Sequence, residues 1–210
     1  MINAISHQGV QQHFCRAELH SHADTCSVND VAYVLEYFSK VAEVYGFSKS
    51  LSVKEDIPID KAAFAYDDHN TGETLIVVVN QALYFGDKLS NVLLNLNQMR
   101  AHGLTVNECP KHLSRGKSEH AIITKDGSHT FPLKLKGLMS YFEVCTLTLE
   151  EIANCHHIEI TSLNIEWEPY SDVFAEEEIK YLQATDDQNV YPLQIKSISS
   201  EYDDFPDTIF

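Results

Sequence analysis

Short apolar runs separated by turns set the strongest limit on what this chain can fold into. The run Ala62–Tyr66 is followed by a polar turn, Asp67–Gly72, and by a second run, Thr74–Val79, in which β-branched residues dominate. Such runs suit the pleated surface of a sheet, and polar residues with glycine between them suit a hairpin. The pair Asp126-Gly127, again between apolar segments, repeats this hairpin signal. The sequence therefore predicts a mainly β fold.

One segment has the period of a helix instead. Apolar residues recur at spacings of three and four before Gly103, namely Leu89, Val92, Leu93, Leu96 and Met99. An apolar stripe that stops at a glycine is typical of an amphipathic helix, expected here at about residues 91–102, with Asn95, Gln98 and Arg100 on its solvent side. A short helix is also expected near residues 149–154, because Thr148-Leu-Glu-Glu is a capping-box sequence.

The last part of the chain is more acidic than the rest. Acidic pairs and triplets such as Glu176–Glu178 stand between isolated apolar residues there. A segment of this composition buries little apolar surface. We therefore expect a β domain at residues 1–150 and an acidic C-terminal extension at residues 151–210.

Charge and composition exclude several classes of partner. The chain has 31 acidic and 15 basic residues, a formal charge of −16, which repels nucleic acid and anionic membranes. No apolar run approaches the roughly 20 residues of a membrane-spanning helix, and the first residues lack a secretory-signal pattern. The cysteines, five in number and scattered, fit reduced thiols. A cytoplasmic location is expected.

Reactive side chains are densest in the stretch Ala17–Asn29. It contains His20, Ser21, His22, Asp24, Thr25 and Cys26 within seven positions, directly after a short strand-like segment. Serine, threonine and aspartate favour turns because their side chains bond nearby backbone groups. The stretch therefore predicts a corner where a strand ends and a loop presents side chains. An aspartic-protease corner and a His-x-His metal pair are the two chemistries that compete for it.

The stretch Glu18–Thr25, which reads Glu-Leu-His-Ser-His-Ala-Asp-Thr, resembles the protease signature of Copia-type retrotransposon polyproteins. One algal and protist branch of that family reads Leu-Asp-Ser-His-Ala-Asp-Thr-Cys. The segment Ala82–Gly103 is similar to the family's strand, turn and leucine-rich helix, and Gly137–Tyr141 is similar to its closing strand. The resemblance spans about Arg16–Phe142, in the family's order.

This resemblance implies a retropepsin-like closed β domain with one main helix, a hairpin flap within Asp56–Val79, and a symmetric homodimer. In that family two aspartates, one from each copy, share a proton and activate water. Here His20 stands at the position of that aspartate, next to Ser21 and His22. Facing imidazoles cannot replace the paired carboxylates, so protease activity should be lost. Asp24-Thr25, a shifted Asp-Thr pair, is the alternative catalytic position.

The same residues also resemble the opening of the polymerase-and-histidinol-phosphatase superfamily of metal-dependent phosphoesterases. Alternate residues of a strand share a face, so His20 and His22 are a candidate metal-ligand pair. That fold needs repeated strand–helix units and further ligands. The other dense histidine site, Cys155-His156-His157, is a poor ligand pair because adjacent residues of a strand point to opposite faces.

The sequence thus favours a retroelement-derived, retropepsin-like domain that is inactive as a protease. Its expected partners are another copy of itself, as a homodimer or higher homo-oligomer, or an extended peptide. No cofactor is expected. The metal-dependent phosphoesterase is the alternative.

Overall fold

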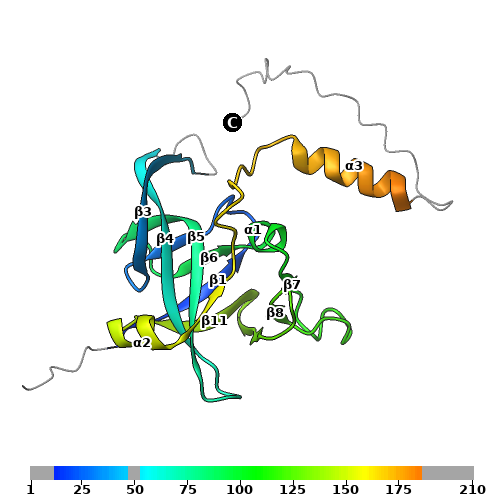
Figure 1. Cartoon of the computed structure of the whole chain (residues 1–210). Coiled ribbons are helices and arrows are strands. Elements are labelled where there is room, and N and C mark those ends of the chain that lie inside the picture. The colour runs from blue at the N-terminus through cyan, green and yellow to red at the C-terminus, as the bar shows by residue number, and fades with distance from the viewer. Residues whose placement is uncertain (1–11, 47–52, 186–210) are drawn as a thin grey trace, which may run out of the picture. The chain divides into compact units, whose positions relative to one another are not determined.

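The protein is described by a computed structural model over residues 12–46 and 53–185. Within these ranges it is mainly β, as predicted, with a nine-stranded mixed sheet, a separate three-stranded sheet and short helices (Figure 1). The large sheet contains β1 (Phe14–His20), β2 (Ser27–Asn29), β3 (Tyr33–Val44), β4 (Lys54–Asp67), β5 (Thr74–Gly86), β6 (Val92–Asn95), β10 (Lys134–Lys136), β11 (Met139–Cys145) and β12 (His156–Glu159). The small sheet contains β7 (Thr105–Asn107), β8 (Ala121–Ile123) and β9 (Thr130–Pro132). The helices are α1 (Leu96–Ala101), α2 (Leu149–Asn154) and α3 (Val173–Thr185).

The large sheet bends back on itself. Its strand order is β10-β11-β1-β6-β2-β5-β4-β3, and β12 adds to β5 in parallel. A further pairing of β11 with β4, at Cys145 and Ala65, joins strands that are distant in this order. The ring is therefore closed only in part, where the sequence led us to expect a closed β domain.

The hairpin of β4 and β5 confirms the strands and the turn predicted at residues 62–79. Phe64 pairs with Val77, and these residues face one core, whereas Ala63, Ile76 and Val78 form a second cluster on the other face. A strand buried on both faces reads as a continuous apolar run, not as an alternation. This burial explains why the run was visible in the sequence.

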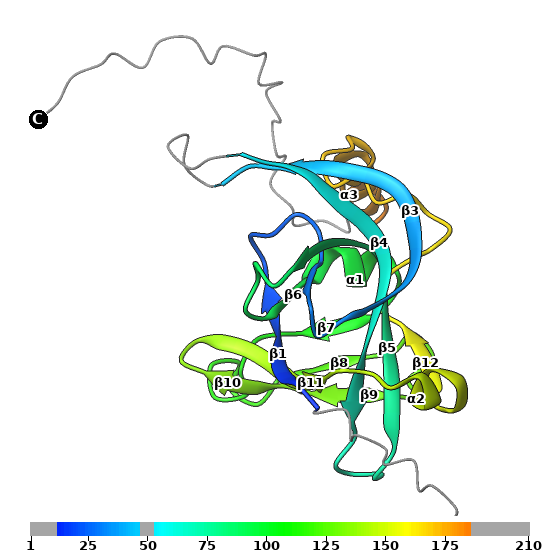
Figure 2. The same ribbon diagram turned by 90° about the vertical axis from the view of Figure 1, so that its left-hand side faces the viewer.

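The hairpin of β3 and β4 is of a different kind. It is long and curved and extends beyond the rest of the large sheet (Figure 2). Along β3, Tyr37 is 75% exposed and Val41 is 60% exposed. Its register with β4 shifts at three places, one of which contains Ser39 in the left-handed region at φ 56°. β3 is thus an exposed and repeatedly bulged edge strand.

The helix predicted at about residues 91–102 is shorter than expected. Residues 92–95 form β6, which pairs in parallel with β1, and α1 begins only at Leu96. Asn95 is the N-cap: its side chain accepts a hydrogen bond from the Gln98 backbone N–H at 2.6 Å. The prediction was wrong for 92–95 because pairing with β1 outweighs the helical period of the leucines.

The other helix expectations have mixed outcomes. The short helix near 149–154 is confirmed, with the predicted capping box between Thr148 and Glu151. The helix α3 was not predicted. Contacts divide the chain into two units, residues 1–169 and 170–210, so that β12 and the segment after it belong with the sheet. In the described part of the chain no helix is both long and apolar enough to cross a membrane.

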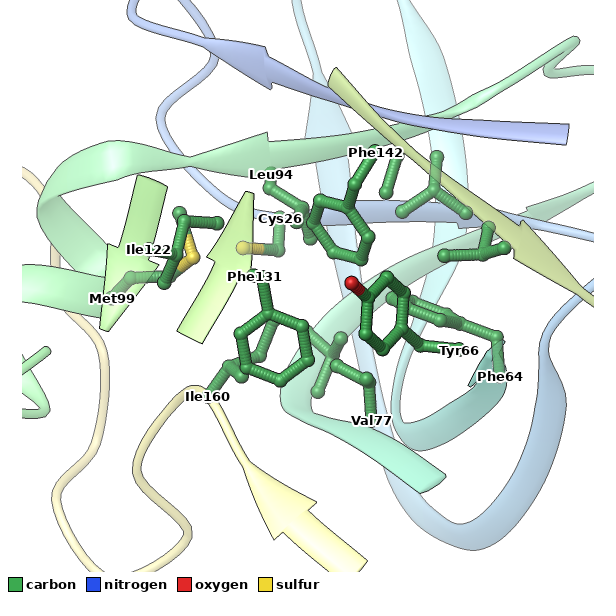
Figure 3. Close-up of a cluster of buried hydrophobic side chains, with 14 of the residues drawn as sticks. Cys26, Phe64, Tyr66, Val77, Leu94, Met99, Ile122, Phe131, Phe142 and Ile160 are labelled. Atoms are coloured by element: carbon green, nitrogen blue, oxygen red, sulfur yellow. The ribbon is translucent and has the colours of Figure 1, made fainter. Parts of the chain in front are cut away.

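Three aromatic rings join the small sheet to the large one. Tyr66 of β4, Phe131 of β9 and Phe142 of β11 have ring centroids 5.0–5.6 Å apart (Figure 3). All three are buried, and burial raises the pKa of the Tyr66 phenol to about 12. Aromatic rings at these separations add attraction to the gain from burial. Phe131 is therefore one of the buried contacts that dock the three-stranded sheet, together with Val106 and Ile122.

Replacing Phe131 with alanine should lower the free energy of unfolding by about 3–5 kcal/mol, because it empties a buried aromatic site. Urea denaturation followed by circular dichroism measures this. The matched control is Phe14→Ala, since Phe14 is 66% exposed and its loss should change stability by less than about 1 kcal/mol. Equal effects of the two variants would contradict the packing described above.

Candidate functional site

The candidate site is the loop that connects β1 to β2, residues 21–26, together with His20. Ala17 and Leu19 of β1 point into the core, so Glu18 and His20 lie on the opposite face of the strand. The parallel pairing of β1 with β6 aligns His20 with Asn95, the last residue of β6. The loop therefore leaves β1 beside the start of α1.

Two side chains at the start of α1 hold this loop. The Asn95 amide donates a hydrogen bond to the Ala23 carbonyl, and the Gln98 amide oxygen accepts from the Cys26 backbone N–H at 2.8 Å. The same Gln98 amide also donates to the carbonyls of Asn80 and Gln81 on β5. Both amides are almost fully buried, at 4% and 3% exposure. Our expectation that Asn95 and Gln98 face solvent was wrong, and only Arg100 is exposed.

The loop presents its polar side chains outward. Ser21, His22 and Asp24 are exposed and Thr25 is half-buried, whereas Cys26 is fully buried. Burial raises the pKa of the Cys26 thiol to about 12, and its sulfur accepts the Asn95 backbone N–H at 3.2 Å. Because only a thiolate is a good nucleophile, Cys26 is a packing residue of this corner.

The two histidines of the motif lie close together. Their ring centroids are 6.1 Å apart, and the rings are nearly perpendicular. Nδ1 of His22 lies 3.0 Å from the Ser21 hydroxyl oxygen. Nδ1 of the half-buried His20 is enclosed and has no hydrogen-bond partner among residues 12–46 and 53–185. This orphaned nitrogen is unusual, since enclosed polar atoms are nearly always paired.

A segment that is distant in the sequence and follows β12 also reaches the loop. The indole N–H of Trp167 donates to the Asp24 carbonyl at 2.8 Å, and the Trp167 backbone N–H donates to the Gln81 side chain at 2.9 Å. Gln81 in turn donates to the carbonyls of Ser162 and Ile165. Its backbone is in the left-handed region at φ 56°. Four hydrogen bonds thus connect the segment Ser162–Trp167 to β5 and to the loop.

The predicted site residues His20, Ser21, His22, Asp24 and Thr25 all lie on this one corner. The second histidine site lies elsewhere: His156 and His157 are exposed at the start of β12, where His156 stacks on His129. In residues 12–46 and 53–185 no group of three or more histidine, cysteine or acidic side chains is arranged to hold a metal ion. Sequence reasoning missed Asn95, Gln98 and Gln81.

A comparison of the chain with protein-family models, curated proteins and solved structures finds no match. Any assignment of function therefore depends on the geometry of this corner and on the motif itself.

Replacing Gln98 with alanine should open the loop, because it leaves the buried Cys26 N–H without an acceptor, at a cost of about 1–3 kcal/mol. The protonated, buried Cys26 thiol should react slowly with a thiol reagent at pH 8 in the wild type and faster in Gln98→Ala. Mass spectrometry of labelled peptides separates Cys26 from the exposed Cys109. The control is Asn97→Ala on the exposed face of α1. An unchanged Cys26 rate in Gln98→Ala would contradict this support.

Proposed function

We propose that this chain is a retropepsin-like domain that associates with a second copy of itself and has no aspartic-protease activity. One observation carries the proposal. The parallel pairing of β1 with β6 puts the loop that contains the motif directly against the start of α1. The resemblance implies that a strand ends at the motif and that a later segment of strand, turn and helix, Ala82–Gly103, belongs to the same domain. In this chain that later segment supplies both the strand and the helix that lie against the motif.

The order of the other elements supports the same proposal. Between the motif loop and β6 the chain forms β2, the β3–β4 hairpin and the β4–β5 hairpin. The resemblance led us to expect the flap within Asp56–Val79, but most of that range is buried strand. The exposed and extended β3–β4 hairpin is a better candidate (Figure 2). We therefore assign the role of the flap to Tyr33–Val44 and the first part of β4.

The chemistry of the corner supports the loss of activity. An aspartic protease needs two carboxyl groups that share one proton, so that one activates water and the other protonates the substrate carbonyl. The strand end in this chain carries the imidazole of His20 instead. A pair of imidazoles offers no carboxylate to activate water. Self-association, or the binding of an extended peptide beside the flap, is the function that remains.

The 210-residue chain should therefore form a dimer in solution. Light scattering coupled to gel filtration should give about twice the chain mass of 23.8 kDa at micromolar concentrations. The resemblance implies that the domain is completed only across a two-fold contact. A mass that stays at one chain across this concentration range would remove the self-association proposal.

The wild-type protein should not cleave peptides at acidic to neutral pH, whereas His20→Asp should give weak cleavage. Replacing one residue restores a carboxyl group in each copy, and the loop that holds it is unchanged. Cleavage of a fluorogenic peptide library measures this, and the matched control His22→Asp should give none. The prediction is contradicted if the wild-type protein cleaves peptides, Asp24→Asn abolishes this cleavage and His20→Ala does not. Asp24 would then be the catalytic residue.

A further inference from the structure

The proposed loss of protease chemistry leaves two imidazoles at the corner without a role. His20 ends β1 and His22 lies two residues later in the loop, and their ring centroids are 6.1 Å apart. Neutral imidazole is a strong ligand for zinc and other late transition metals. Two imidazoles that approach each other at this corner supply half of a tetrahedral ligand set.

The hydrogen bonds of the two rings are compatible with metal binding. The Ser21 hydroxyl lies 3.0 Å from Nδ1 of His22, so this nitrogen is engaged and Nε2 is left as the metal-binding atom. A partner on the second ring nitrogen is the usual way in which proteins orient a metal-binding histidine. Ser21 would therefore fix the orientation of the His22 ring.

The His20 ring is not fixed in this way. Among the described residues its Nδ1 is enclosed without a hydrogen-bond partner, so a turn of the ring about the Cβ–Cγ bond breaks no bond at that nitrogen. The turn exchanges the positions of Nδ1 and Cδ2. An unpaired nitrogen in a protein interior is unfavourable, and coordination to a metal would satisfy it. This orphaned atom is the second, independent indication of a ligand.

One copy of the chain has too few ligands for a stable site. In the described ranges, the corner does not gather a third histidine, cysteine or carboxylate with His20 and His22. Cys26 is excluded because its thiol is buried and already accepts the Asn95 N–H. The site is incomplete unless a second chain contributes to it.

We propose that two copies share one zinc ion through His20 and His22 of each copy, and that zinc strengthens self-association. This rests on the proposed function, which brings the two motif loops together at a two-fold axis. The metal supplies a cation where two strongly acidic chains meet, each with a formal charge of −16. The four imidazoles complete the tetrahedral set that neither copy has alone.

Sedimentation velocity of the untagged 210-residue chain tests this after removal of metal with EDTA. Zinc chloride should lower the dimer dissociation constant at least about tenfold, because a ligand that binds only the dimer shifts the equilibrium towards it. Magnesium chloride at the same concentration controls for the general screening of charge. Elemental analysis of the separated dimer should find one zinc ion for every two chains.

The variants His20→Ala and His22→Ala should each lose the zinc response, measured against each variant's own association in EDTA. Because His22 is exposed, its variant should fold normally even if the His20 variant does not, and circular dichroism checks both. The matched control is His129→Ala, which removes one ring of the other close histidine pair and should leave the zinc response intact.

The outcomes separate the two proposals. A dimer in EDTA that zinc does not tighten overturns the metal site and leaves self-association standing. A monomer under every condition overturns both. A zinc response that persists in the His20 and His22 variants, or that magnesium reproduces, also overturns the metal site.

Discussion

The buried amide of Gln98 is the contact on which the rest of this corner depends. Burying an amide is unfavourable when its oxygen or nitrogen is left unpaired, and Gln98 pairs both by accepting from Cys26 and donating to two carbonyls of β5. It thereby joins the motif loop, the first turn of α1 and the centre of the sheet. Asn95, one turn earlier, caps the helix and holds the Ala23 carbonyl. His20 and His22 keep their positions because the backbone of the loop is held by these buried amides.

The strands of the core could be predicted from the sequence, and the short β6 strand could not. The β4–β5 hairpin can be recognised in the sequence from two apolar runs joined by a polar turn. The runs are continuous because both faces of the strands are buried. In β6 the leucines satisfy a helical and an extended pattern equally well. The choice is made by the partner strand β1, which lies more than 70 residues earlier in the chain. The pairing with β1 cannot be predicted from the pattern of neighbouring residues alone.

The residues of the candidate site could also be predicted only in part. His20, Ser21, His22 and Asp24 lie within five consecutive positions, so their density was visible in the sequence. Their supports were not, because Gln98 reaches Cys26 across 72 positions and Trp167 reaches Asp24 across 143. Glutamine on an amphipathic helix is most often solvated, and only the fold shows that this one is buried. Reactive residues that lie close together in the sequence can be found from the sequence alone. The residues that hold them in place are distant in the sequence and are identified only from tertiary contacts.

The bulged edge of β3 has a consequence for how copies of the chain can meet. An exposed edge strand offers unpaired backbone groups to any neighbouring chain, and a long flat edge would permit growth into fibres. The three register shifts along β3, with Ser39 in a left-handed conformation, interrupt the regular spacing that such growth requires. Tyr37 and Val41 remain available for side-chain contact while the backbone ladder is blocked. β3 can therefore contact another chain through its side chains, whereas its backbone does not support the continuous strand pairing of a fibre.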